Sequence, residues 1–358
     1  MHELTVSAPG RICLFGEHQD FLGLPVIAAA IDLRIWVEGT RRPDSLLKID
    51  LPDIGKFNLI DLSQPIVYTR KRDYLRSCIN VLRRRGFDIS SGYDCRIHSN
   101  IPINAGVSSS SALTVAWLKF LLTASGDSSH KPEDLARLAH QAEVVEFGEP
   151  GGMMDHFASA LGGLIYVDCR PPFSAKRLSV LLEGFVLGDS LEKKKTLMVL
   201  SDSRANMQEG LRFLAESYPG FDLHSTPLRE VDDLIHRLPA HIAGKVRANL
   251  INRDLNIEVM KLFDQELDPR KLGSLFVKEH EQLRDGIGVS TQKMDLMLEA
   301  ALDAGALGGK MNGSGGGGCM FAYAPGREDA VADALERAGG KAHKVKVDKG
   351  ACVEAARE

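Results

Sequence analysis

Alternating apolar and polar positions near the N-terminus predict strands over LTVSA, RICLFG and PVIAAAIDLRIWVEGT, which lie between turn signals. DYLRSCINVLRRRG then repeats apolar residues at helical spacing and ends at Gly86. YDCRIHSNIPI predicts a strand that leads into a serine-rich loop, and SALTVAWLKFLLTAS after it predicts a strongly apolar helix. KPEDLARLAHQAEVVEFGE predicts a second helix with one polar face.

The pattern changes in the second half of the chain. GGLIYVDCR and KTLMVLSDS predict strands, and residues 204–300 read as mostly helical. The glycine-rich stretch GGKMNGSGGGGCMFAYAP follows, with CMFAYAP as a strand, and a short α/β segment closes the chain. We therefore expect an α+β protein with a boundary near residue 190. A length of 358 residues suits two domains, 1–190 and 191–358.

Composition narrows the function classes. The net charge is −4 and no large basic cluster is present, so the sequence gives no support for nucleic-acid binding and we expect no nucleic-acid partner. The short basic runs in TRKRDYLRS and VLRRRGF indicate the solvated face of one helix, or a weak attraction for an anionic ligand. No stretch is long and apolar enough to span a membrane, and the N-terminus lacks signal-peptide features. The six cysteines form no CxxC pair, which favours a reducing, cytoplasmic location.

The run INAGVSSSSAL places four serines between a strand and a buried helix. That position argues against a flexible linker. A helix N-terminus offers free N–H groups and the positive end of the helix dipole. Gly106 allows close approach of the backbone to a ligand, and serine hydroxyls can bind phosphate or Mg²⁺. N-capping by one serine is the alternative, but it needs only one hydroxyl. We therefore favour a phosphate-binding loop.

Two glycine-rich matches to nucleotide motifs are weak. GALGGKM has the wrong spacing for a Walker A loop. NGSGGGGC satisfies GxGxxG formally, but a strand follows it where a dinucleotide-binding loop needs a helix. A NAD-dependent oxidoreductase is therefore disfavoured, and the glycines indicate a tight turn or close backbone approach.

Two polar groups are further candidates. The segment APGRICLFGEHQDFLG places four polar residues close together among apolar ones: Arg11, Glu17, His18 and Asp20. They form either surface ion pairs or a site for a hydroxyl-rich ligand. Asp155, in GGMMDHFASALGG, is an N-cap or a functional base. Glu143 lies in a predicted helix and is otherwise an ordinary surface residue.

Three segments resemble, in the same order along the chain, the three motifs of the GHMP kinase superfamily: PGRICLFGEHQDFLG, IPINAGVSSSSAL and GGKMNGSGGGGC. Within it, GEHQD, GGMMDHF and LRDGIGVSTQKMDLMLEAAL most resemble the galactokinases. The resemblance covers nearly the whole chain. It implies a two-domain α+β fold, with an N-terminal domain like ribosomal protein S5 domain 2 and a ferredoxin-like C-terminal domain. It also implies that ATP and a small-molecule sugar bind between them, and that the protein is a monomer or homodimer.

The resemblance assigns roles residue by residue. Asp155 matches the catalytic aspartate, and Arg11 matches the arginine that keeps it ionised. Ser110 and Glu143 match the Mg²⁺ ligands. Sugar hydroxyls would be held by Glu17, His18, Asp20, Gly152 and Asp155. The ATP phosphates would lie in the loop Asn104, Ala105, Gly106, Val107, Ser108, Ser109, Ser110 and Ser111. The glycine-rich motif would support them through Gly313, Ser314, Gly315 and Gly316.

The expected activity is transfer of the ATP γ-phosphate to the anomeric hydroxyl of a monosaccharide, galactose by default. The chain departs from the family at His156, where glutamine is usual, and at Gly151, where cysteine is common. Ala105 replaces a common glycine, and SDSRANMQEG lacks a tyrosine that contacts the sugar. LFGEH and LPVIAAAI resemble mevalonate kinases. Another sugar 1-kinase or a mevalonate kinase is therefore the alternative, and a non-catalytic sugar sensor is an alternative of another class.

Overall fold

The computed structural model describes residues 3–102, 105–127, 129–149, 151–193 and 196–355. Its strands are β1 Glu3–Phe15, β2 Val26–Arg41, β3 Leu46–Leu51, β4 Lys56–Asp61, β5 Tyr93–Ser99, β6 Leu164–Asp168, β7 Ser174–Arg177, β8 Phe185–Asp189, β9 Gly308–Met311, β10 Cys319–Tyr323, β11 Lys341–Val345 and β12 Cys352–Val353. Its α-helices are α1 Tyr74–Arg84, α2 Ser109–Ala124, α3 Pro132–Glu143, α4 Met154–Leu161, α5 Thr196–Ser217, α6 Leu228–Ile235, α7 Ala240–Phe263, α8 Pro269–Glu281, α9 Gln292–Asp303 and α10 Glu328–Arg337.

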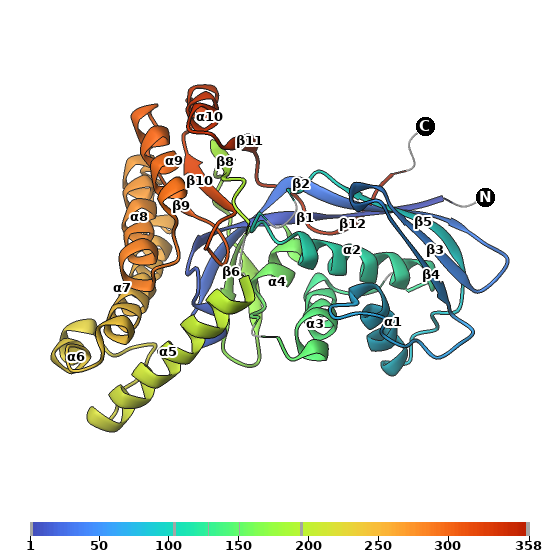
Figure 1. Ribbon diagram of the computed structural model, residues 1–358, viewed down its shortest axis with the longest axis horizontal. Coiled ribbons are helices and arrows are strands. Elements are labelled where there is room, and N and C mark those ends of the chain that lie inside the picture. Colours follow the sequence, from blue (N-terminus) through green and yellow to red (C-terminus); the bar gives the residue numbers. More distant parts are fainter. Residues whose placement is uncertain (1–2, 103–104, 128, 150, 194–195, 356–358) are drawn as a thin grey trace.

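Two sheets organise the described chain (Figure 1). The larger has the order β12-β1-β2-β5-β3-β4, with β6 beside β2 and β7 beside β6. The smaller has the order β11-β8-β10-β9 and is antiparallel throughout. Strand β8 precedes residue 190 but lies in the smaller sheet, and β12 from the end of the chain pairs with β1. The two halves of the sequence therefore exchange strands on both sides of the expected boundary.

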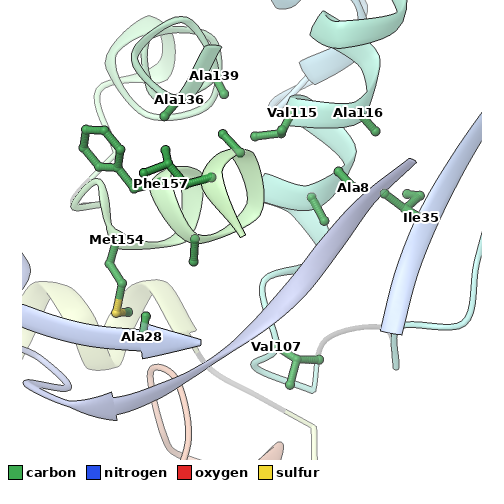
Figure 2. Packing of buried hydrophobic residues seen from close by; sticks show 14 of the residues in the cluster. Ala8, Ala28, Ile35, Val107, Val115, Ala116, Ala136, Ala139, Met154 and Phe157 are labelled. Atoms are coloured by element: carbon green, nitrogen blue, oxygen red, sulfur yellow. The ribbon is translucent and has the colours of Figure 1, made fainter. Parts of the chain in front are cut away.

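Helices α1–α4 pack together beneath the larger sheet, with α2 and α4 in contact with β1 and β2 (Figure 1). Small side chains make this close packing possible. Alanines from both strands and from α3 lie around α4 in Figure 2: Ala8, Ala28, Ala136 and Ala139. Phe157 of α4 is fully buried among them. Burial of this apolar surface fixes the first turns of α2 and α4, where the serine loop and Asp155 lie.

The smaller sheet is covered by α9 and α10, with α8 against β9. An aromatic cluster joins the two sheets, because Phe276 of α8 stacks on Phe15 of β1 at 4.8 Å and meets Phe321 of β10 edge-on at 5.1 Å. Helices α5–α7 have a separate apolar core. No described helix combines the length and apolarity needed to cross a bilayer.

Most expected elements are confirmed, with three corrections. LTVSA and RICLFG form one long strand, β1, interrupted by irregular register near Pro9 and Cys13. The helix expected over 131–149 ends at Glu143 and is followed by a separate 3-10 turn, Val145–Phe147. The strand expected for KTLMVLSDS is wrong, because Thr196–Ser217 form α5. A short apolar run of leucine, methionine and valine does not distinguish strand from helix by its pattern.

Candidate active site

One cavity collects most of the candidate residues. It is lined by Arg11, Glu17, His18, Asp20, Phe21, Arg72, Tyr74, Gly106, Ser108, Ser109, Ser110, Ser111, Glu143, Val144, Glu149, Gly151, Gly152, Met154, Asp155, His156, Gly313 and Ser314. We call Glu17, His18, Asp20 and Gly152 the acceptor half. We call Gly106, Ser108–Ser111 and Glu143 the phosphate half. Asp155 and Arg11 lie between the two.

Arg11 and Asp155 form an ion pair in which the Arg11 side chain is buried and the Asp155 side chain is 30% exposed. Arg11 Nε donates to Asp155 Oδ1 at 2.7 Å, and Arg11 Nη1 donates to the carbonyl of Gly106 at 2.6 Å. Burial alone would raise the pKa of Asp155, but the charge of Arg11 and smaller neighbouring contributions outweigh it and lower the pKa. Asp155 lies inside the first turn of α4, after the N-cap Met153, so the N-cap alternative is wrong. Asp155 is an ionised carboxylate at neutral pH.

The acceptor half is rich in carboxylates. Glu17 and His18 are only 3% and 4% exposed, so surface ion pairing does not explain this group. Burial, followed by the charge of Asp155, raises the pKa of Asp20 to about 6. A Cβ on Gly152 would lie 1.9 Å from Asp20 Oδ2, so only glycine lets the Asp20 carboxylate occupy this place. His18 Nε2 lies 3.0 Å from the carbonyl of Ser314 and donates to it.

The serine loop feeds α2 as expected. Ser108 is the N-cap residue, in a left-handed conformation, but its side chain makes no capping hydrogen bond. The N-capping alternative is therefore wrong for Ser108, whose hydroxyl leaves the first-turn N–H groups of α2 uncapped, and Ser108–Ser111 line the cavity. Ala105 and Val107 do not line the cavity; their carbonyls accept from the N–H groups of Cys319 and Arg11. Asn104 lies outside the described residues.

Glu143 is buried, 7% exposed, and is not an ordinary surface residue. His156 Nε2 lies 2.9 Å from Glu143 Oε2. Glu143 and Ser110 line the same cavity and supply the oxygen ligands that Mg²⁺ prefers. The described chain has no group of three or more His, Cys, Asp or Glu side chains placed to hold a metal. The pair fits Mg²⁺, which usually keeps water and substrate phosphate ligands besides one or two protein groups.

The backbone conformation of the glycine run accounts for its glycines. Positive φ angles occur at Gly313, Gly315, Gly316, Gly317 and Gly318, a conformation that other residues adopt only with strain. The turn brings Gly313 and Ser314 to the cavity, whereas Gly315 and Gly316 lie outside its lining. Asn312, just before the run, accepts from the N–H of Cys13 and donates to the carbonyl of Gly106.

Sequence reasoning missed several residues. Arg72 is 41% exposed, as expected for its basic run, but it also lines the cavity and pairs with Glu149, another lining residue. Tyr74 lines the same side. Lys310 and Glu279 are fully buried beside Glu17. A charged residue inside an apolar strand such as GGKM was the only signal for Lys310, and Glu279 gave none on its polar helix face.

Family models match three parts of the chain: the GHMP kinases N terminal domain at residues 73–163, the GHMP kinases C terminal domain at 259–341, and the galactokinase galactose-binding signature at 2–41. A mevalonate kinase from Thermococcus sibiricus is 31% identical over 94% of both chains. A galactokinase from Mannheimia succiniciproducens is 28% identical over 90% of this chain and 86% of its own. This chain therefore belongs to the GHMP kinases, a family of ATP-using phosphotransferases.

Solved structures show the same fold. Lactococcus lactis galactokinase complexed with galactose has a TM-score of 0.85 at 22% identity, covering 98% of this chain and 95% of that one. Methanococcus jannaschii mevalonate kinase has a TM-score of 0.75 at 19% identity, covering 97% and 99%. The expected two-domain GHMP kinase fold is confirmed. The mevalonate kinase relatives are more similar in sequence than the galactokinases named here, and the galactokinase structure is more similar in shape.

Proposed function

We propose that the protein is an ATP-dependent sugar kinase that phosphorylates the anomeric hydroxyl of a monosaccharide, with galactose as the default acceptor. Asp155 Oδ1 is held by Arg11 Nε, and we assign Oδ2 to the acceptor hydroxyl. Its low pKa makes Asp155 a weak base, which is tolerable because phosphoryl transfer depends mainly on positioning and charge stabilisation. Arg11 keeps the carboxylate ionised and stabilises charge on the transferring phosphoryl group.

ATP would place its phosphates at the N-terminus of α2, where free N–H groups and the helix dipole favour anions. Ser110 and Glu143 would hold Mg²⁺. When bound, Mg²⁺ neutralises charge on the phosphates of ATP. Ser109 and Ser111, with Gly106, shape the backbone and hydroxyl surface around the phosphates.

The carboxylates of the acceptor half are the observation that carries the choice of a neutral, hydroxyl-rich acceptor. A carboxylate accepts hydrogen bonds from hydroxyls and repels an anionic substrate. Among the described lining residues, Arg11 and Arg72 are the Lys or Arg side chains, and each is already paired with a carboxylate. The signature match at residues 2–41 includes Glu17, His18 and Asp20, which supports galactose.

Mevalonate kinase is the second candidate, because the mevalonate kinase from Thermococcus sibiricus is 31% identical over 94% of the chain. The mevalonate carboxylate would have to enter beside Asp20 and Glu17. A non-catalytic sugar sensor is disfavoured by the complete set of Asp155, Arg11 and Glu143.

We also propose a domain boundary near residue 190, and a cytoplasmic location, which the six free cysteines favour.

The test is ADP release from Mg·ATP with galactose, N-acetylgalactosamine, glucose, mannose, fucose, arabinose, glucuronate and mevalonate as acceptors. We expect turnover with galactose or another neutral sugar. Turnover with mevalonate alone would replace the proposal with the second candidate. Silence with every acceptor, while ATP and a sugar still bind, would favour the sensor.

A further inference from the structure

A buried lysine and two carboxylates meet behind the acceptor half. Lys310 Nζ of β9 lies 3.5 Å from Glu17 Oε2 and 3.8 Å from Glu279 Oε1. The side chains of Lys310 and Glu279 are fully buried, and that of Glu17 is 4% exposed. Of the three, Glu17 lines the cavity. We call these residues the buried triad; it connects the acceptor half to α8 and to the smaller sheet.

Backbone donors fix both carboxylates of the buried triad. Gly16 and Glu17 donate their N–H groups to Glu279 Oε1 at 3.0 and 3.2 Å. Gly313 donates its N–H to Glu17 Oε2 at 2.7 Å. Glu279 therefore holds the backbone at Glu17, whereas Lys310 and Gly313 hold the Glu17 carboxylate through the same oxygen.

Lys310 is a cation despite its burial. Burial alone would lower its pKa, but Glu279 and Glu17 outweigh that effect and raise it. Burial raises the pKa of Glu279 to about 7, with Lys310 opposing the rise. Lys310 Nζ also donates to the carbonyl of Met311 and lies 5.6 Å from the ring centre of Phe321. These contacts leave the ammonium group little freedom to leave Glu17.

Stability is a weak reason for such a group. Moving charges from water into the interior costs free energy that their attraction often fails to recover, and apolar replacements of buried ion pairs are frequently neutral or stabilising. Lys310 lies directly behind Glu17, a carboxylate that lines the cavity, and this position suggests that it orients Glu17. The segment that follows Lys310 holds a second residue of the acceptor half, since the Ser314 carbonyl accepts a hydrogen bond from His18.

We propose that Lys310 is a positioning residue for the acceptor: it holds Glu17 through Oε2, so that Oε1 of Glu17 receives a hydroxyl of the substrate. Glu279 has the accompanying role of holding the backbone of the loop that carries Glu17. This inference rests on the proposed function. It adds a residue of the C-terminal sheet to the determinants of acceptor binding.

The experiment compares two variants with the parent protein. Glu279→Gln keeps an oxygen for the two N–H groups and leaves Lys310 paired with Glu17. Lys310→Met combined with Glu279→Gln removes the cation without leaving Glu279 as an unpaired buried charge. We measure thermal unfolding, the Kd of an ATP analogue, and kcat and KM for the best acceptor of the panel.

We expect Glu279→Gln to change the acceptor KM by less than about threefold, and the double variant to raise it by about tenfold or more, because small misplacements of binding groups have large effects. The Kd of the ATP analogue should stay the same in both. A folded double variant with the parent's acceptor KM overturns the inference. Lower stability with unchanged kinetics does so too, since it shows a purely structural role.

A matched control removes an exposed ion pair. Lys344 and Asp329 are 2.6 Å apart and lie outside the cavity, so Lys344→Met with Asp329→Asn should leave every kinetic constant unchanged. A parent protein that turns over no acceptor overturns the proposed function, and this inference with it. A parent that is active while the double variant is kinetically normal overturns the inference alone.

Discussion

The two halves of the cavity are built in different ways. The phosphate half comes from neighbouring segments of one helical layer: the loop before α2, the first turn of α2 and the end of α3. The acceptor half comes from the segment after β1 and the loop before α4, but it is held from the far end of the chain. Ser314, Gly313 and Glu279 contact His18, Glu17 and the backbone at Gly16 across more than 260 positions of sequence.

This difference separates two kinds of function. The phosphate half offers backbone N–H groups and hydroxyls, which can bind the phosphates of any nucleotide, and its geometry follows from the start of one helix. The acceptor half depends on the packing of both sheets, because Lys310 of β9 holds the Glu17 carboxylate and Glu279 of α8 holds the Glu17 backbone. Substrate choice can therefore change through residues that never touch the substrate.

We expect the largest loss of activity when Asp155, which lies between the two halves, is replaced. Asp155→Ala should lower kcat by roughly 10³-fold or more, because the acceptor hydroxyl loses its proton acceptor and its positioning contact. Arg11→Ala should act comparably, since Arg11 binds both Asp155 and the Gly106 carbonyl. Single-turnover kinetics, ATP-analogue binding and thermal unfolding measure the effect.

Asp155→Asn is the control for Asp155, because it keeps the shape and removes the charge. A folded Asp155→Ala or Arg11→Ala variant that phosphorylates at a near-parental rate would remove the residue from its assigned role.

The sequence predicted the local parts of this arrangement well. The serine run before a strongly apolar segment identified the start of α2, and apolar residues at helical spacing identified α1. It could not predict the buried triad, because Lys310 and Glu279 acquire their roles from contacts between distant segments. Arg72 is exposed, as the basic run predicted, but its place at the cavity could not be predicted, because a basic run does not reveal which segments lie beside it.

Gly152→Ala tests the acceptor half alone. The new Cβ would lie 1.9 Å from Asp20 Oδ2, so the carboxylate must move away. We expect the acceptor KM to rise by roughly ten- to a hundredfold, with the Kd of the ATP analogue unchanged. Gly244→Ala is the matched control: Gly244 lies inside α7, and the atom nearest to its added Cβ would be the Gly286 carbonyl oxygen at 3.1 Å. Equal losses of acceptor and nucleotide affinity would show that the halves are not separable.

Ser110→Ala tests the phosphate half. We expect the Mg²⁺ concentration for half-maximal rate to rise by about tenfold, with the acceptor KM unchanged, because one oxygen ligand is lost. Mg²⁺-dependent binding of an ATP analogue provides a readout without turnover. Ser109→Ala is the neighbouring control and should have less effect. An unchanged Mg²⁺ dependence for Ser110→Ala would assign the ligand to another serine.

The smallest expected effect is a pH dependence confined to the acceptor half. Asp20 faces Asp155, Glu17 and Arg11, and its pKa of about 6 means that it loses its proton on going from about pH 5.5 to about pH 7. The ionised form accepts hydroxyl donors at both oxygens, so the acceptor KM should fall by about fourfold over this range. Asp155 has a lowered pKa and stays ionised throughout, so kcat should stay nearly constant.

Glu279, with a pKa of about 7, also titrates in this range, and Glu279→Gln separates its contribution. The fall in KM should persist in Glu279→Gln and disappear in Asp20→Asn. A profile that flattens only in Glu279→Gln would transfer the pH dependence to the buried triad. A change in kcat with a constant KM would instead locate the titrating group at the phosphoryl-transfer step, and the separation between the two halves would fail.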